Sequence, residues 1–174
     1  MPDYRIPDID GWMGNDEMQW LFDRACEMES IVEIGSWMGR STHALLSGCK
    51  GTVWAVDHFQ GNPGQRDGPH ARAKTEDIHA IFMANVGNFT NLKVLKMDSA
   101  EAAKQFEPKS IDLIFLDGDH DFEAVKKDLL AWMPICKKLL CGHDISEGGV
   151  RQALEATGIR IDGEISAIWW SEIK

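Results

Sequence analysis

The chain has 174 residues and a formal net charge of −10, with 44% hydrophobic and 26% charged residues, so one compact globular domain over residues 1–174 is expected. The acidic balance argues against a general nucleic-acid-binding surface. We find no apolar run of membrane-spanning length and no secretory signal, which predicts a cytoplasmic protein without a membrane partner. None of the four cysteines forms a C-x-x-C pair, so neither a zinc knuckle nor a redox motif is indicated.

The first half of the chain alternates helical and strand patterns. Asn15 is expected to cap a helix with Met18, Leu21, Phe22 and Ala25 on one face. Apolar runs and helical spacings then predict, in order, a strand over 31–34, a helix over 41–46, a strand over 52–56, a helix starting at Thr75 and a strand over 92–96.

The second half continues the alternation and ends in a hairpin. The expected elements are a helix over 100–106, a buried strand over 111–116, a helix opening at Asp121, a strand over 139–142, a helix over 149–157, and strands over 159–162 and 165–170 with Gly163 as their turn. This order predicts the α/β class: a Rossmann-like, doubly wound, mostly parallel seven-stranded sheet with a C-terminal antiparallel hairpin.

A long loop over residues 58–74 interrupts the pattern with three glycines and two prolines. Loops of this length are often lids or disordered segments. The loop carries the basic side chains of His58, Arg66, His70 and Arg72. These side chains suggest a lid that folds over the substrate and offers positive charge. A solvated, mobile loop is the alternative.

Acidic residues follow all five of the predicted parallel strands. The strand ends are Glu33-Ile-Gly-Ser36, Asp57-His58, Asp98-Ser99, Asp117-Gly-Asp-His120 and His143-Asp144. Because the carboxyl ends of parallel strands meet at one edge of a sheet, where ligands bind, these side chains predict a site. Acids also favour loops for other reasons, but five in a row, accompanied by histidines, favour a site.

The loop after the first strand suggests which ligand binds there. A dinucleotide loop has a glycine where Trp37 stands between Gly35 and Gly39, and this bulky side chain obstructs the approach of a pyrophosphate. Asp57 follows Gly35 by 22 residues along the sequence, which is the separation at which an acid binds ribose hydroxyls in nucleotide-binding folds. A ribose without a pyrophosphate points to S-adenosylmethionine (SAM). Trp37 in plain core packing is the alternative, and the other tryptophans are expected mostly in the core or at its edge.

Three segments resemble a known family. The stretch VEIGSWMGRST is similar to motif I of class I SAM-dependent methyltransferases. IDLIFLDGDHDFEAVKKDLLAWMP, followed by CGHDI, resembles a subgroup with D-G-x-H and G-H-D segments, related to macrocin O-methyltransferase and cephalosporin hydroxylase-like proteins. The terminal segment GVRQALEA…ISAIWW also fits. The resemblance covers residues 10 to 170.

The resemblance implies roles for individual residues. Glu33, Gly35, Ser36, Trp37 and Gly39 would form the methionine end of the cofactor site. The remaining implied cofactor contacts are Ser41 and Thr42 at the SAM carboxylate, Asp57 with His58 at the ribose, Asp98 and Ser99 at the adenine, and Asp117 between cofactor and substrate.

Catalysis and metal binding are expected at the last two parallel strands. Relatives such as catechol O-methyltransferase hold Mg²⁺ with an acid after the fourth strand and an acidic pair after the fifth. Asp117, His143 and Asp144 occupy those places, but the histidine departs from the oxygen ligands that Mg²⁺ prefers. Whether Mg²⁺, another divalent cation or no metal binds stays open. Asp117, His120 and His143 are the candidate catalytic residues, and His120 as a purely structural hydrogen-bonding residue is the alternative.

These observations predict a SAM-dependent methyltransferase, EC class 2.1.1, that acts on a hydroxyl of a small-molecule acceptor. Two rivals remain: an NAD-dependent oxidoreductase on the same fold, and a non-catalytic SAM-binding or scaffold protein. Two features argue against the oxidoreductase: Trp37 in the loop after the first strand, and the lack of a Tyr-x-x-x-Lys motif, because Tyr4 is the only tyrosine. The carboxylates at all five strand ends argue against the second. Assembly into a homo-oligomer stays open.

Overall fold

The structure is a computed structural model that describes residues 4–65, 67–68 and 70–174. The helices are α1 (Asn15–Ala25), α2 (Arg40–Gly48), α3 (Ile78–Val86), α4 (Ser99–Ala103), α5 (Phe122–Trp132) and α6 (Gly148–Thr157), with short 3-10 turns η1 (Pro63–Gln65) and η2 (Ala71–Lys74). The strands are β1 (Ser30–Ile34), β2 (Thr52–Val56), β3 (Leu92–Leu95), β4 (Ile111–Leu116), β5 (Cys136–Gly142), β6 (Gly163–Ile165) and β7 (Ile168–Glu172).

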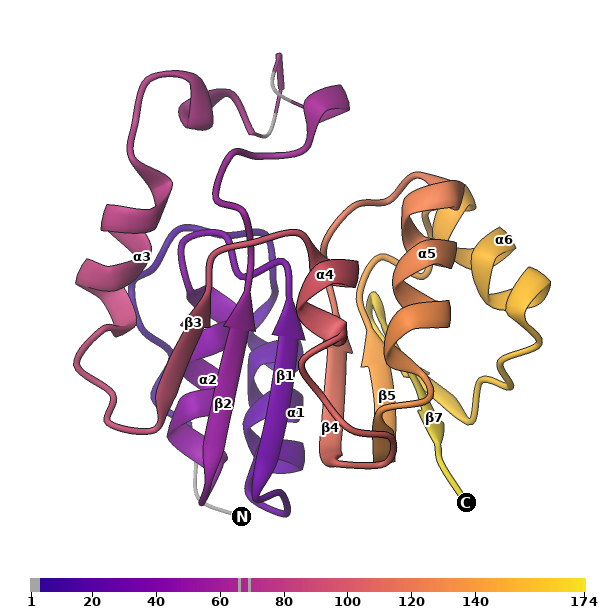
Figure 1. The fold of residues 1–174 in the computed structure, drawn as a ribbon. Coiled ribbons are helices and arrows are strands. Elements are labelled where there is room, and N and C mark those ends of the chain that lie inside the picture. Colours follow the sequence, from indigo (N-terminus) through magenta and orange to yellow (C-terminus); the bar gives the residue numbers. More distant parts are fainter. Residues whose placement is uncertain (1–3, 66, 69) are drawn as a thin grey trace.

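The strands form one seven-stranded sheet in the order β3-β2-β1-β4-β5-β7-β6 (Figure 1). Strands β1 to β5 are parallel, β7 is antiparallel to β5, and β6 is antiparallel to β7. The chain leaves β1 in one direction through β2 and β3, then returns to the other side of β1 with β4. This reversal creates a switch point between β1 and β4 and confirms the doubly wound, Rossmann-like α/β prediction.

Two layers of helices cover the sheet because neighbouring residues of each buried strand point to opposite faces. In β4, Leu113 and Phe115 pack in the core that contains α1, α2 and α3, whereas Ile114 and Leu116 pack in the core that contains α4, α5 and α6. Figure 1 shows α4 and α5 in front of the sheet and α1 and α2 behind it. Within the described residues, no helix combines the length and the apolar character needed to span a membrane.

Several predicted boundaries are corrected by local contacts. Helix α1 begins at Asn15 with Gly14 as its cap, because the Glu17 carboxylate accepts the Gly14 N–H at 2.7 Å. Helix α3 begins at Ile78 rather than Thr75, since the Asp77 side chain caps it. Strand β5 begins at Cys136, three residues earlier than predicted.

The terminal hairpin is also shifted from its predicted place. Residues 159–162 are not a strand, and the turn lies between Ile165 and Ile168, where Ser166 has φ 50°. Gly163 lies inside β6 instead of forming the turn. A Cβ atom at this glycine would lie 2.2 Å from Cζ2 of Trp170 on β7, so glycine is needed for the close approach of that indole.

Candidate active site

A cavity of about 470 Å³ lies at the carboxyl edge of the parallel strands, beside the switch point. Its wall comes from the turns after β1 to β5, from residues 10–13 and from the loop after β2. Both the position and the volume are typical of small-molecule sites in open α/β sheets. The predicted site residues that reach its wall are Gly35, Ser36, Trp37, Ser41, Asp57, His58, Asp98, Ser99, Asp117, His120, His143 and Asp144.

The loop after β1 passes close to the end of β4, which explains its first glycine. Gly35 has φ 86°, and a Cβ atom there would lie 2.1 Å from the carbonyl oxygen of Asp117. Trp37 has a positive φ of 46°, and its N–H donates to Oδ2 of Asp57 at 2.8 Å. Asp57 also accepts the N–H of Phe59 through Oδ1 at 2.6 Å. The acid after β2 therefore holds the loop after β1 while facing the cavity.

Three predicted cofactor residues, Glu33, Gly39 and Thr42, do not reach the cavity wall. The Glu33 carboxyl is fully buried and accepts the hydroxyls of Ser41 and Thr42, each at 2.5 Å. Burial raises the pKa of Glu33. These contacts tie the end of β1 to the first turn of α2, so the two hydroxyl donors act inside the protein. Gly39, with φ 92°, caps α2 against the side chain of Val86.

The residues after β3 build the opposite end of the cavity. Asp98 caps α4 by accepting the N–H of Glu101 and pairs with Lys127 at 3.1 Å. The Ser99 hydroxyl accepts the indole N–H of Trp132 at 2.7 Å and hydrogen-bonds the carboxyl of Asp128. Asp128 also lines the cavity, and burial raises its pKa to about 6. It was missed in the sequence because it lies within α5, seven residues beyond the predicted start at 121.

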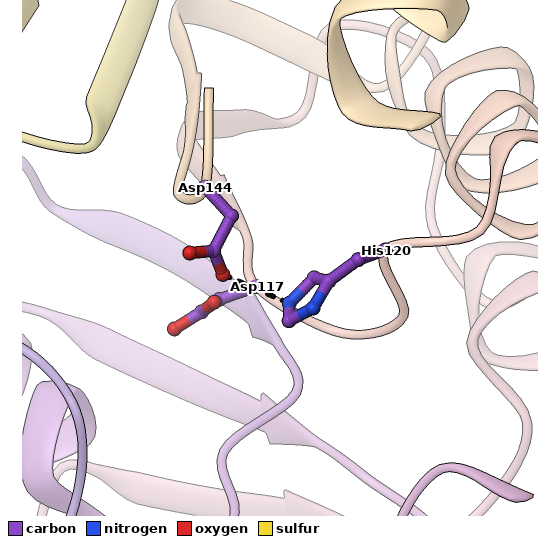
Figure 2. Close-up of side chains that lie close together, drawn as sticks. All are labelled: Asp117, His120 and Asp144. Atoms are coloured by element: carbon purple, nitrogen blue, oxygen red, sulfur yellow. Dashed lines mark ion pairs between the residues drawn. The ribbon is translucent and has the colours of Figure 1, made fainter. Parts of the chain in front are cut away.

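Two acids and a histidine converge at the ends of β4 and β5 (Figure 2). Ligand atoms of Asp117, His120 and Asp144 all lie within 4.8 Å of one another. Nε2 of His120 lies 2.9 Å from Oδ2 of Asp144. Nδ1 of His120 lies 3.0 Å from Nε2 of Gln65, on the loop after β2. With its proton on Nε2, the His120 ring donates to Asp144 and accepts from the amide of Gln65 at Nδ1.

The pKa values of the three residues in this cluster are shifted in different directions. Burial raises the pKa of Asp117 to about 7. Hydrogen bonds from His120 and His143 outweigh burial and lower the pKa of Asp144 far below its ordinary value. The hydrogen bond with Asp144 raises the pKa of His120. Clusters with such opposed shifts are typical of functional sites.

His143 is held by carboxylates on both sides. Its Nδ1 lies 3.2 Å from Oδ2 of Asp144 and 3.7 Å from Oδ1 of Asp117, and its Nε2 lies 3.1 Å from Oε1 of Glu17. Although burial opposes it, hydrogen bonds to Asp144 and Glu17 raise the pKa of His143 to about 10. A doubly protonated ring has no lone pair with which to accept a proton or bind a metal. Both ring nitrogens of His143 face carboxylates, whereas Nδ1 of His120 faces an amide. This difference favours His120 over His143 as base and as metal ligand.

Glu17 lies outside the cavity lining, but it is a buried partner of His143 that the sequence did not reveal. Only 4% of it is exposed, and its Oε1 also accepts the N–H of Ala167 in the terminal hairpin. The only local signal is its position three residues after the Gly14 cap, which explains a helix start but not a contact with His143.

The described residues of the loop over 58–74 line the cavity at His58, Gly61, Asn62, Gln65 and His70. The side-chain amide of Asn62 donates to the carbonyl of Gly118 at 2.9 Å, and the Asn62 N–H donates to Nδ1 of His70 at 2.9 Å. Arg72 pairs with Asp10 of the N-terminal segment at 2.6 Å. These contacts place the loop over the site, and its movement as a lid stays a prediction. Arg66 lies outside the described residues.

The chain matches a family model described as a methyltransferase domain over residues 32–145. Because this match spans well over half of the chain, the protein belongs to that family. The resemblance to methyltransferases is thereby confirmed, whereas the narrower subgroup with D-G-x-H and G-H-D segments stays a prediction.

The chain is also similar to individual proteins and solved structures. The uncharacterized protein y4gI of Sinorhizobium fredii is 31% identical over an alignment of 121 residues. The alignment covers 66% of this chain but only 12% of that protein's length. Cofactor-bound Rv0187 from MTB has a TM-score of 0.69 at 15% identity, with 97% of this chain and 83% of that chain covered. The SAH-bound methyltransferase PaMTH1 of Podospora anserina has a TM-score of 0.64 at 14% identity, with 94% and 80% covered. At these identities the two solved structures show a shared fold.

Proposed function

We propose that this protein transfers the methyl group of SAM to a hydroxyl oxygen of a small molecule. The observation that carries the proposal is the His120–Asp144 pair beside Asp117, at the wall of the cavity that also contains the Gly35 loop and Asp57. The methyltransferase family match supports the reaction class. The resemblance to the macrocin O-methyltransferase subgroup favours oxygen as the acceptor atom.

The cavity fits a nucleoside without a pyrophosphate. Each Asp57 oxygen accepts one backbone N–H, and its remaining lone pairs suit ribose hydroxyls. Trp37, which lines the cavity, stands where a dinucleotide loop has the glycine that admits a pyrophosphate. Asp98, Ser99 and Asp128 offer polar groups for the base at the far end. The binding of SAH by PaMTH1, which has the same fold, also supports SAM as the methyl donor.

His120 is placed to take the proton of the acceptor hydroxyl. Asp144 orients the ring through Nε2, and Nδ1 accepts a hydrogen bond from Gln65. An acceptor hydroxyl can replace this amide as the donor to Nδ1. As the oxygen attacks the methyl carbon, the carbon–sulfur bond breaks, its electron pair goes to sulfur, and the hydroxyl proton passes to His120. S-adenosylhomocysteine (SAH) is the other product.

Assistance by a divalent cation is a second candidate, favoured by the convergence of Asp117, His120 and Asp144. Two carboxylates and one imidazole fit Mn²⁺, Fe²⁺ or Zn²⁺ better than Mg²⁺, because nitrogen ligands suit the former ions. Bound there, a cation would lower the pKa of the acceptor hydroxyl. Turnover that depends on the metal in the wild type and is lost in Asp144→Asn would support this candidate. Equal turnover with and without a chelator would exclude it.

The acceptor is proposed to be a small molecule, with neither nucleic acid nor membrane as a partner. The cavity volume of about 470 Å³ leaves limited room beside a nucleoside, and the net charge of −10 repels polyanions. A cytoplasmic location is proposed because the four cysteines are free thiols, which suit a reducing compartment.

The proposed function is tested by calorimetric titration with SAH, with NADH as the control. We expect micromolar binding of SAH, no binding of NADH, and weaker SAH binding in Asp57→Ala. Asp117→Asn should retain SAH binding and lose turnover, which separates an enzyme from a SAM-binding scaffold. Binding of NADH in place of SAH would overturn the proposal in favour of the oxidoreductase, and binding of neither would favour the scaffold.

A further inference from the structure

Three aromatic rings from separate segments gather at the cavity. Trp12 comes from the N-terminal segment, Trp37 from the loop after β1, and His70 from the loop after β2, and all three line the cavity. The rings of Trp37 and His70 are stacked with centroids 4.6 Å apart. The ring of Trp12 is tilted against both, 5.3 Å from His70 and 5.9 Å from Trp37. We refer to these residues as the aromatic cluster.

The aromatic cluster has features that core packing does not explain. Trp12 is 60% exposed, although it lines a cavity, so much of its indole surface is left uncovered by the described residues. Trp37 adopts a left-handed backbone conformation that is unfavourable for a bulky residue, and Asp57 holds it there through its N–H. Strained residues of this kind concentrate at ligand sites, and large aromatic side chains bind planar rings by stacking.

The aromatic cluster is linked to the proposed base by short contacts. The N–H of His70 donates to the carbonyl of Gln65 at 3.0 Å. The side chain of Gln65 in turn lies 3.0 Å from Nδ1 of His120. The backbone segment that carries His70 thus also positions the Gln65 side chain at the base. We expect a ring stacked on the cluster to present a substituent toward that side chain and the base.

The charge of the cavity limits which ring can bind. Among its described lining residues, eight are acidic, whereas the only lysine and arginine are Lys127 and Arg40. Lys127 pairs with Asp98, and Arg40 donates to the carbonyls of Ile9 and Met13. Burial lowers the pKa of His70, which favours a neutral ring. The protonated His143 ring, which also lines the cavity, is already paired with Glu17 and Asp144. An anionic ligand would therefore face repulsion, because each of these cations is already engaged by the protein.

We propose that the acceptor is an aromatic hydroxyl compound, neutral or cationic, whose ring stacks on Trp12 while its hydroxyl takes the place of the Gln65 amide at His120. This inference rests on the proposed methyl transfer and adds the substrate class. It excludes nucleotide-linked sugars and phenolic carboxylates as preferred acceptors.

The test measures ligand binding to the complex with SAH, so that it does not depend on turnover. Catechol is the neutral probe, dopamine the cationic probe and 3,4-dihydroxybenzoate the anionic probe, because the three share one ring. UDP-glucose represents the nucleotide-linked sugars. We expect catechol and dopamine to bind, 3,4-dihydroxybenzoate to bind at least about tenfold more weakly, and UDP-glucose not to bind.

Variants then assign the binding to the indole. Trp12→Leu should weaken catechol binding about tenfold, whereas Trp12→Phe, which keeps a planar face, should weaken it by about threefold or less. Leu130→Ala is the matched control, because Leu130 is 55% exposed and lies outside the cavity lining. SAH affinity should be unchanged in all three variants.

Equal catechol affinity in Trp12→Leu and wild type, or preferred binding of UDP-glucose or the anionic ring, would overturn the proposal. Wild-type protein that binds SAH but no aromatic ring would refute this inference alone. Failure to bind SAH would refute the proposed function on which the inference depends.

Discussion

Replacing the buried carboxylate of Glu17 should destabilise the whole fold, because this side chain joins three distant segments. Its Oε1 accepts hydrogen bonds from Nε2 of His143 at 3.1 Å and from the N–H of Ala167 at 2.8 Å. Its Oε2 accepts the N–H of Gly14 at 2.7 Å. Glu17→Ala removes all three hydrogen bonds and leaves the His143 ring facing only Asp117 and Asp144.

The magnitude follows from the burial of both partners. Glu17 is 4% exposed and His143 is 8% exposed, so water cannot readily replace the lost carboxylate. Removing one partner of a buried ion pair costs about 3–5 kcal/mol. For a chain of this size, each kcal/mol lowers the melting temperature by about 2–4 °C. Glu17→Ala should therefore melt roughly 6–20 °C below the wild type at pH 6.

Differential scanning calorimetry at pH 6 measures the effect, with Asp16→Ala as the control. Asp16 is the preceding acid on α1, and its side chain is exposed while accepting the hydroxyl of Ser166. Its removal should shift the melting temperature by no more than about 2 °C. A melting temperature for Glu17→Ala within 2 °C of that control would show that the buried pair contributes nothing and would refute the reasoning.

Three further results are expected. Folding raises the pKa of His143 to about 10, so the protonated ring stabilises the fold fully below its ordinary pKa of about 6.5, and this stabilisation is lost as the pH rises through 10. The difference in melting temperature between wild type and Glu17→Ala should therefore narrow from pH 6 to pH 10. A difference that stays constant would contradict this pH dependence. Gly35→Ala should lower stability by several kcal/mol and abolish SAH binding, because its Cβ would lie 2.1 Å from a carbonyl oxygen; thermal melts and calorimetry check both, and wild-type affinity would disprove the steric argument. Arg72→Ala breaks the exposed pair with Asp10 and should raise the KM of the acceptor a few-fold without changing SAH affinity or melting temperature; unchanged kinetics would show that the loop is not a lid.

The sequence by itself determined most of the fold and the location of the site. The buried strand over 111–116 is apolar except for Asp112, and helices such as α5 repeat apolar residues at helical spacing, so both follow from local pattern. In a parallel sheet all carboxyl ends share one edge. The acids at 57, 98, 117 and 144 could therefore be assigned to one cavity before any contact was known, and the structure places all four on its wall.

Tertiary structure alone decided how the site residues pair. Glu17 and His143, which form a hydrogen bond, are 126 residues apart in the sequence. The hydroxyls of Ser41 and Thr42 donate to the buried carboxyl of Glu33 and not to a ligand. The position of the terminal hairpin was decided by the packing of Trp170 against a glycine. Local propensity cannot encode such choices, because a buried polar group takes whichever partner the packed layers bring within hydrogen-bonding distance.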